Sequence, residues 1–106
     1  MRVLFDQGTP SPLRRGLLLH AVETAHERGW STLRNGALLQ AAEDAGFEVM
    51  ITTDQNLQYQ QNLAARRIAI IVLSTTSWPR IRAATDAIAN AVARCATDRF
   101  IEISIP

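Results

Sequence analysis

The sequence contains no lysine, a single cysteine and few aromatic residues. All 11 basic residues are arginine, and they stand against 10 acidic residues, so the formal net charge is only +1. A balance this close excludes a strong global field that would attract nucleic acid or an anionic membrane, and it leaves such recognition to local patches. The lone Cys95 excludes an internal disulfide and every zinc site that is built from several cysteines.

Long apolar runs are missing as well. The longest one, around Ile68–Leu73, is far shorter than the roughly 20 residues that a membrane-spanning helix needs. The N-terminus lacks a basic start followed by an apolar core, so we expect a soluble, cytoplasmic protein. With 106 residues, of which 47% are apolar and 20% charged, the composition predicts one globular domain over residues 1–106.

Five short segments have the composition of β-strands. Arg2–Phe5 and Phe47–Thr52 are the clearest, and Ile68–Leu73 is a continuous apolar run typical of a strand buried on both faces. Ala21–Thr24 is a weaker candidate, and Phe100–Ile105 alternates as a last strand. Helical segments lie between them, and this alternation predicts an α/β three-layer sandwich with a mainly parallel sheet of four or five strands.

The first predicted helix follows the Arg2–Phe5 strand. Thr9 or Ser11 is expected to cap it, and Leu13, Leu17 and Leu18 give it an apolar side at helical spacing.

The later helices are marked by different signals. Asn35 is predicted to cap a helix that Gly46 closes. Gln55–Ala65 is polar and amide-rich, with Leu57 and Leu63 spaced for one buried stripe. Arg80–Arg94 is predicted to form one amphipathic helix.

Two predicted strands end in an aspartate, Asp6 after the first and Asp54 after Phe47–Thr52. If these strands are neighbours, both carboxylates share one site at the carboxyl edge of the sheet, where ligands bind in folds of this kind. Like charges so close favour a shared proton or a divalent cation between them, and Mg²⁺ suits phosphodiester chemistry. The alternative is that each aspartate only caps the helix that follows.

Three motifs resemble those of the small bacterial PIN-like domains, which are related to the PIN ribonucleases and their VapC-type toxins. The motifs are Leu4-Phe-Asp-Gln, Asn35-Gly-Ala-Leu-Leu-Gln-Ala-Ala and Val49-Met-Ile-Thr-Thr-Asp-Gln-Asn-Leu. The resemblance implies a Rossmann-like PIN-type fold, Mg²⁺ or Mn²⁺ held by acidic residues, and cleavage of RNA by a metal-activated water. Asp6 and Asp54 match two of the acidic positions of the family.

Asn35 stands where related PIN-like domains usually place a third acidic residue. An amide can donate an oxygen to a metal, but it brings no negative charge and cannot act as a base. Glu43 and Asp44 lie about two turns further along the helix, where they are expected to be solvated or salt-bridged. Two alternatives follow: a nuclease site made of Asp6, Asn35 and Asp54, or a site that has lost catalysis and retains binding of RNA or a protein partner.

Other polar side chains are expected at the same edge of the sheet. They could orient water or contact the phosphates and sugars of RNA, and the alternative is ordinary loop and cap chemistry. These candidates for substrate binding are Gln7, Arg14, Arg15, Thr53, Gln55, Asn56, Ser74 and Thr75.

A different small phosphoryl-transfer domain, similar to a receiver or a phosphatase, is a third alternative. The absence of lysine weakens it, because receiver-like sites commonly use a lysine to bind phosphate. The resemblance to PIN-like domains also implies a small antitoxin as a partner and a homodimer, besides RNA as the substrate.

Overall fold

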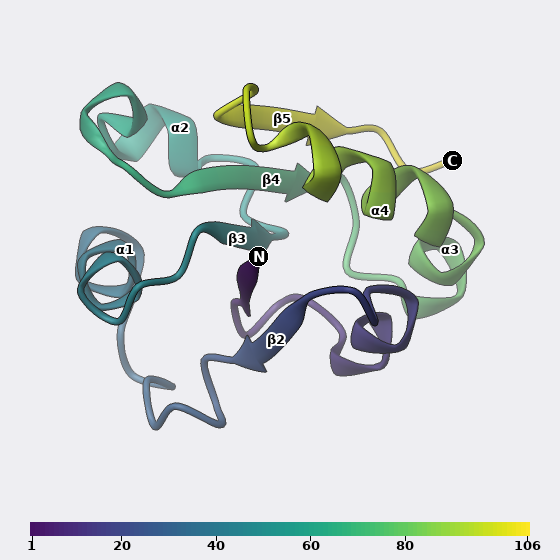
Figure 1. Ribbon diagram of the computed structural model, residues 1–106, viewed down its shortest axis with the longest axis horizontal. Helices are drawn as coiled ribbons and strands as arrows, with labels where there is room; N and C mark the ends of the chain where they lie inside the picture. The colour runs from purple at the N-terminus through teal and green to yellow at the C-terminus, as the bar shows by residue number, and fades with distance from the viewer.

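Five strands form one fully parallel sheet in the computed structural model, which describes residues 1–106. Their order across the sheet is β2-β1-β3-β4-β5 (Figure 1), so the predicted α/β fold with a mainly parallel sheet is confirmed. Each strand lies within its predicted segment. The strands are β1 (Arg2–Phe5), β2 (Ala21–Thr24), β3 (Val49–Thr52), β4 (Ala69–Leu73) and β5 (Phe100–Ile103).

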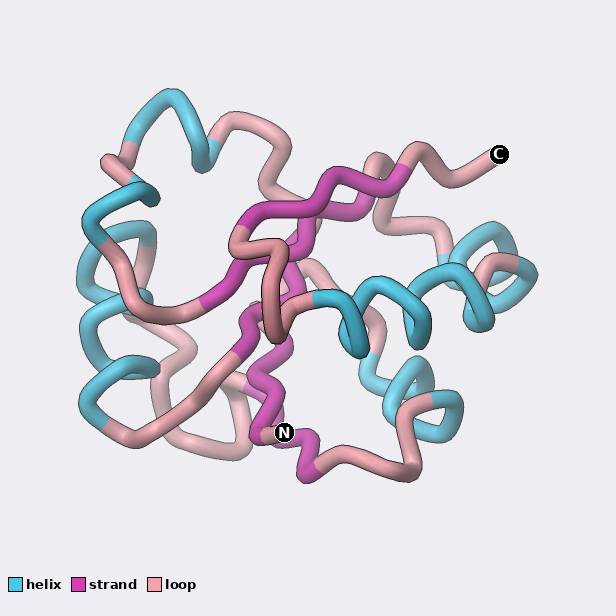
Figure 2. Tube along the Cα trace, turned by 45° about the horizontal axis from the view of Figure 1, so that its top comes forward, coloured by secondary structure: helices cyan, strands magenta, loops and turns pink.

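Helices cover both faces of this sheet (Figure 2). The helices α1 (Asn35–Asp44) and α2 (Leu57–Gln60) lie on one face, together with the 3-10 turn η2 (Leu63–Ala65). The other face is covered by the 3-10 helix η1 (Ser11–Gly16) and by α3 (Trp78–Ala83) and α4 (Thr85–Arg94). None of these helices combines the length and the apolar character that a membrane crossing requires.

Two hydrophobic cores result from the alternation of side chains along the strands. In β1, Val3 and Phe5 belong to the core under η1, α3 and α4, whereas Leu4 belongs to the core under α1 and α2. All five residues of β4 are buried, as the continuous apolar run predicted. Both faces of the central strands are therefore covered, and polar side chains gather at the strand ends.

The direction of winding reverses between β1 and β3. From β1 the chain crosses to β2 on one side, and it then returns to place β3 on the other side of β1. The predicted neighbour relation between the first strand and the strand that ends near Asp54 is confirmed by the parallel pairing of β1 with β3. This arrangement opens a crevice beyond the carboxyl ends of these two strands.

The segment Arg80–Arg94 is not one helix, contrary to the sequence prediction. Ala84 leaves helical geometry with φ −107°, and it separates α3 from α4. The Thr85 hydroxyl donates to the Arg82 carbonyl oxygen at 2.8 Å, a bond between side chain and backbone that competes with helix continuation.

The first predicted helix is also shorter than expected. Neither Thr9 nor Ser11 caps it, because Pro10 takes the cap position and η1 ends at Gly16. Leu13 and Leu17 are buried as predicted, but Leu18 lies beyond the helix and is 83% exposed.

Asn35 does not cap α1, contrary to the prediction. It is the first residue of the helix with φ +48°, and Arg34 takes the cap position without a side-chain hydrogen bond. In the amide-rich segment, only four residues form α2. Leu57 is buried there, but Leu63 is only half-buried, so the predicted buried stripe is incomplete.

Glu43 fastens the end of α1 to the start of β4. Its carboxylate accepts hydrogen bonds from the Arg66 guanidinium at 2.9 Å and from the backbone N–H groups of Arg67 at 2.5 Å and Ile68 at 3.3 Å. Burial raises the pKa of Glu43, but these hydrogen bonds outweigh it and hold the pKa below its ordinary value. The expectation of a salt-bridged Glu43 is confirmed.

We expect Glu43→Ala to lower the free energy of unfolding by about 2 kcal/mol at pH 7, because the substitution removes charge-assisted hydrogen bonds. Since the pKa is lowered in the fold, this contribution is present above about pH 5 and is lost as the pH falls through the folded pKa. Urea unfolding at several pH values measures it. Asp44→Ala, at an exposed carboxylate of the same helix, is the control with little effect; equal losses in both variants would contradict the assignment.

Candidate functional site

Two aspartates stand at the carboxyl ends of the neighbouring strands β1 and β3. The register pairs Phe5 with Ile51, and the Asp6 N–H donates to the Ile51 carbonyl oxygen at 3.2 Å. Asp54 follows two residues after the end of β3. Both aspartates therefore lie at the point where the sheet changes its winding direction, as the sequence predicted.

The Asp6 carboxylate is held by hydroxyl and amide donors on two sides. Its Oδ1 accepts hydrogen bonds from the Thr9 N–H at 3.1 Å and from the Thr9 hydroxyl at 2.8 Å. Its Oδ2 accepts one from the Thr52 hydroxyl. The Thr9 hydroxyl also lies 2.8 Å from the Ile51 carbonyl oxygen, so one proton serves two acceptors. These bonds fix the carboxylate to β3 and to the turn that follows β1.

Burial raises the pKa of the Asp6 carboxyl above its ordinary value, and the hydrogen bonds from Thr52 and Thr9 offset only part of this effect. None of the ion pairs in the structure involves Asp6. The charged form of this carboxyl is therefore partly desolvated without a counter-charge, a situation that a cation in the crevice would relieve.

Asp54 is positioned by the same threonine that holds Asp6. The Thr52 hydroxyl oxygen accepts a hydrogen bond from the Asp54 N–H at 3.0 Å. Asp54 Oδ1 accepts one from the Asn56 N–H at 3.0 Å and closes a turn, which leaves Oδ2 without a protein donor. From the last position of β3, Thr52 thus links the Asp6 carboxylate to the backbone of Asp54.

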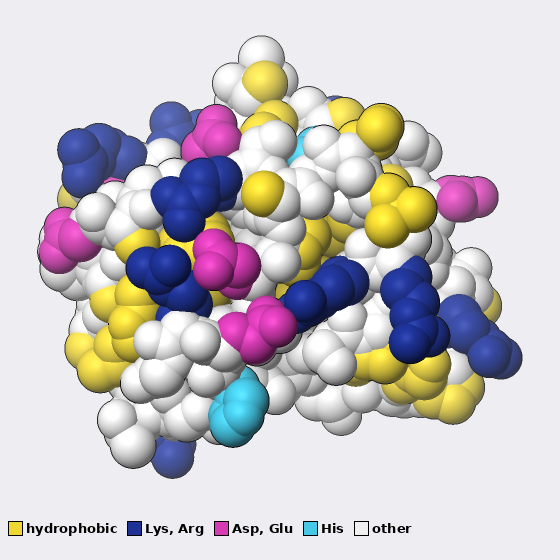
Figure 3. Space-filling view, turned by 60° about the horizontal axis from the view of Figure 1, so that its bottom comes forward, with side chains coloured by type: hydrophobic (Ala, Val, Ile, Leu, Met, Phe, Trp, Pro, Cys, Tyr) yellow, Lys and Arg dark blue, Asp and Glu magenta, His cyan; other side chains and the backbone are white.

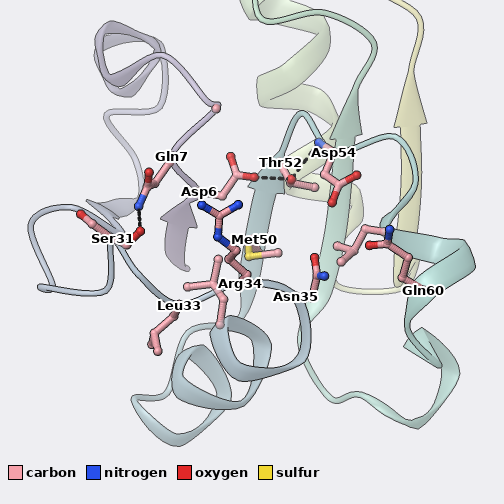
Figure 4. A pocket seen from close by; sticks show the side chains of 13 residues that line it. Asp6, Gln7, Ser31, Leu33, Arg34, Asn35, Met50, Thr52, Asp54 and Gln60 are labelled. Carbon is pink, nitrogen blue, oxygen red and sulfur yellow. Dashed lines mark hydrogen bonds between the residues drawn. The ribbon is translucent and has the colours of Figure 1, made fainter.

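A pocket of about 370 Å³ lies over these strand ends. The side chains of Asn35, Asp54 and Gln60 point into the same space from α1, from the end of β3 and from α2 (Figure 4). Arg34 reaches into the pocket beside Asp6, and it forms no ion pair. The remaining wall consists of Gln7, Gly8, Ser31, Leu33, Leu38, Met50, Thr52 and Leu57.

A second hollow of about 610 Å³ adjoins the first, and Asp6 and Gln7 line both. Gln7 lies where the two meet, and its side-chain amide donates to the Ser31 carbonyl oxygen. Arg14 and Arg15 lie in this second hollow. On this side of the molecule, arginines at the left and in the centre of the view lie against acidic side chains, whereas those at the right have no acidic neighbour in view (Figure 3).

The two arginines of the second hollow differ in their partners. Arg14 donates to both carboxylate oxygens of Glu27, at 3.2 Å and 2.5 Å. The hydrogen bond from Arg14 lowers the pKa of Glu27 to about 2, so the pair stays ionised at neutral pH. Arg15 forms no ion pair, and its charge is available to an anion.

Five of the predicted contact residues line neither hollow, although they lie in the loops at the same edge of the sheet. Ser74 accepts a hydrogen bond from the Ile105 N–H at 2.7 Å, and the Gln55 amide donates to the Ser74 carbonyl oxygen at 3.2 Å. Thr75 accepts one from the Ser77 N–H, so these groups fasten the loop after β4. The five residues are Thr53, Gln55, Asn56, Ser74 and Thr75.

Several residues of the site were not anticipated from the sequence. Arg34 precedes Asn35 at the start of a helix, and this position is the only signal in the sequence that places it at the same pocket. Thr52 ends an apolar strand two residues before Asp54. A polar residue at the end of an otherwise apolar strand indicates a role for its hydroxyl, and Thr52 is buried in the structure. Thr9 and Gln60 had no comparable signal, because their roles depend on how the loops fold back.

The donor set fits one hydrated Mg²⁺ or Mn²⁺ rather than a metal caged by protein. Asp54 Oδ2 and the Asn35 amide oxygen accept no hydrogen bond from the protein, and Asp6 Oδ2 accepts only one. Mg²⁺ commonly takes one or two carboxylates and completes its shell with water and substrate phosphate. The structure contains no group of three His, Cys, Asp or Glu side chains placed to hold a metal.

No protein-family model, no curated protein and no solved structure gives a significant match to this chain.

We expect Asp6→Asn to be more stable than the wild type at neutral pH, because a neutral amide avoids the desolvation of the charged carboxylate. The pKa of Asp6 is raised in the fold, so its stabilising contribution is complete below about pH 4 and is lost as the pH rises through the folded pKa. The advantage of Asp6→Asn should therefore shrink in acid, as urea unfolding at several pH values would show. A variant that is less stable than the wild type to the same extent at every pH would contradict this account.

Proposed function

We propose that this protein is a metal-dependent ribonuclease of the PIN-like type that hydrolyses RNA phosphodiesters with a water molecule. One observation carries the proposal: two carboxylates from the ends of adjacent parallel strands share a pocket whose opening is lined by an arginine without an acidic partner. The motifs that resemble PIN-like domains include both aspartates and Asn35, and these three residues lie together in that pocket.

Asp6 and Asp54 would hold Mg²⁺ or Mn²⁺, and Asn35 would complete the ligand set or position a water. When bound, such a cation neutralises phosphate charge and lowers the pKa of an attacking water. The Thr52 hydroxyl and Thr9 hold the Asp6 carboxylate from two sides, and the Asn56 N–H holds the Asp54 carboxylate. The carboxylates are thus preorganised, which reduces the cost of ordering them around a cation.

Arg34 and Arg15 are the residues placed to contact the RNA backbone. One lies in each hollow, on either side of Asp6 and Gln7, and neither has an acidic partner. Single-stranded RNA that runs from one hollow to the other past Asp6 and Gln7 would place a phosphodiester above Asp6, with a guanidinium on each side. Arg14 was expected to share this role, but its charge is already neutralised by Glu27.

A second function, a non-catalytic module that binds RNA or a protein partner, is favoured by a specific observation. The Asp6 carboxylate accepts three hydrogen bonds from two threonines, as a structural aspartate does, and an amide occupies position 35. The two functions differ in whether a divalent cation is required.

The resemblance to PIN-like domains also supports a proposal about the role of the protein in the cell. In this reading the protein is the toxin component of a toxin–antitoxin pair, it is restrained by a small antitoxin, and it acts as a homodimer in the cytoplasm.

We expect the wild type to cleave a mixed pool of RNA with Mn²⁺ or Mg²⁺, and EDTA to stop the reaction. Asp6→Asn and Asp54→Asn should each lower the rate on the order of 100-fold, because each removes charge from the metal site. Gel analysis of end-labelled RNA measures the rate.

Asp98→Asn is the matched control for this experiment. Asp98 is an exposed carboxylate just before β5, at the opposite edge of the sheet, so the rate should not change. Folded wild type that binds RNA but cuts with neither metal would favour the non-catalytic module. Cutting that survives both substitutions would place the active site elsewhere.

We expect Arg34→Ala and Arg15→Ala each to weaken RNA binding and to lower the slope of log K against log salt by about 0.7, the value for one phosphate contact on a single strand. Fluorescence anisotropy without a divalent cation measures this. The double variant Arg14→Ala/Glu27→Gln removes an ion pair without changing the net charge, so its slope should equal that of the wild type. A larger loss in the double variant than in Arg34→Ala or Arg15→Ala would contradict the assignment.

A further inference from the structure

Asn35 and Gly36 form a chemically labile junction at the start of α1. Asn35 has φ +48°, outside helical geometry. The Arg34 carbonyl oxygen accepts a 3-10-type hydrogen bond from the Ala37 N–H at 3.1 Å and only a long one from the Leu38 N–H, at 3.5 Å. The helix therefore begins irregularly at this junction.

Both groups that could react at this junction lack hydrogen-bond partners. Asn35 is exposed, and its side-chain amide makes no hydrogen bond within the protein. The Gly36 N–H is one of the amides at a helix start that have no intrahelical acceptor, and no other group accepts from it. Gly36 has no Cβ to shield its nitrogen.

We propose that Asn35 is a site of spontaneous deamidation that converts the amide in the pocket to a carboxylate. The Gly36 backbone nitrogen bonds to Asn35 Cγ, the bond from Cγ to Nδ2 breaks, and the Gly36 amide proton leaves with the nitrogen as ammonia. Water then opens the resulting succinimide. Cleavage of the Cγ–N bond gives aspartate at position 35, and cleavage at the backbone carbonyl gives isoaspartate; neither step needs an oxidant or a reductant.

The position of Asn35 gives this reaction a consequence for the pocket. The side chain points into the space that Asp54 also faces, and Asp6 lines the same pocket (Figure 4). A carboxylate at position 35 adds a third negative charge there, which raises the affinity for a divalent cation. This consequence rests on the proposed function, whereas the deamidation itself does not.

The first test follows the modification alone. Folded wild type, incubated at mildly alkaline pH, should gain the mass of an amide-to-acid exchange, release ammonia and acquire one negative charge on ion exchange. Peptide mass spectrometry should locate the change at Asn35 rather than at other asparagines such as Asn56 or Asn90.

Gly36→Ala is the matched control, because a Cβ slows attack by the following nitrogen. The added Cβ would lie 2.9 Å from the Gln61 side-chain oxygen, the mobile end of a flexible chain, so the fold should tolerate it. Faster change in the wild type than in Gly36→Ala supports the proposal. Wild type that stays unmodified while the urea-unfolded chain deamidates would overturn it, since the fold would then protect the junction.

The second test addresses the pocket by calorimetric titration with Mn²⁺. Asn35→Asp and the aspartate form of aged wild type should bind Mn²⁺ at least about tenfold more tightly than fresh wild type. Modification without any gain in affinity would leave the deamidation intact and contradict the metal site of the proposed function. Tight Mn²⁺ binding by Asn35→Asp, combined with no modification of the wild type, would overturn only the deamidation.

Discussion

The parallel pairing of β1 with β3 is the constraint on which the candidate site depends. It sets Phe5 beside Ile51, and it thereby places Asp6 next to Thr52. With β2 on one side of β1 and β3 on the other, the chain winds in opposite directions from this pair, and no connection covers the carboxyl ends. A different strand order would have separated Asp6 from Asp54 by one or more strands.

The same pairing makes the site costly for the fold. The Asp6 carboxylate is desolvated at the end of a buried strand. Threonine hydroxyls are the only side-chain groups that donate hydrogen bonds to it. Neutral donors stabilise a carboxylate less than a guanidinium does. Glu43 illustrates the contrast, because its own buried carboxylate pairs with Arg66 and keeps a lowered pKa. The structural carboxylate of Glu43 is therefore paired with a guanidinium, whereas the Asp6 carboxylate at the pocket forms no ion pair.

The strands and the adjacency of the two aspartates could be predicted, because apolar runs and their polar ends are local signals. Asn35, Asp6 and Asp54 do line one pocket, as expected. The break at Ala84 was not predicted, because the apolar spacing of Arg80–Arg94 fits a continuous helix and does not show that the Thr85 hydroxyl bonds to the Arg82 carbonyl oxygen. Likewise, only the folded structure shows that Arg14 is paired with Glu27, because the two residues are separated by another strand.

The amide at position 35 limits the negative charge that the pocket carries when the chain folds. Three carboxylates in one pocket would repel each other, and desolvation already penalises the charge of Asp6. Asn35 supplies an oxygen without adding to that repulsion, and it occupies a left-handed backbone position that asparagine adopts more readily than most residues. The chain therefore folds with two aspartates and one amide at this edge, and under the proposed function the affinity for a cation depends on the chemical state of that amide.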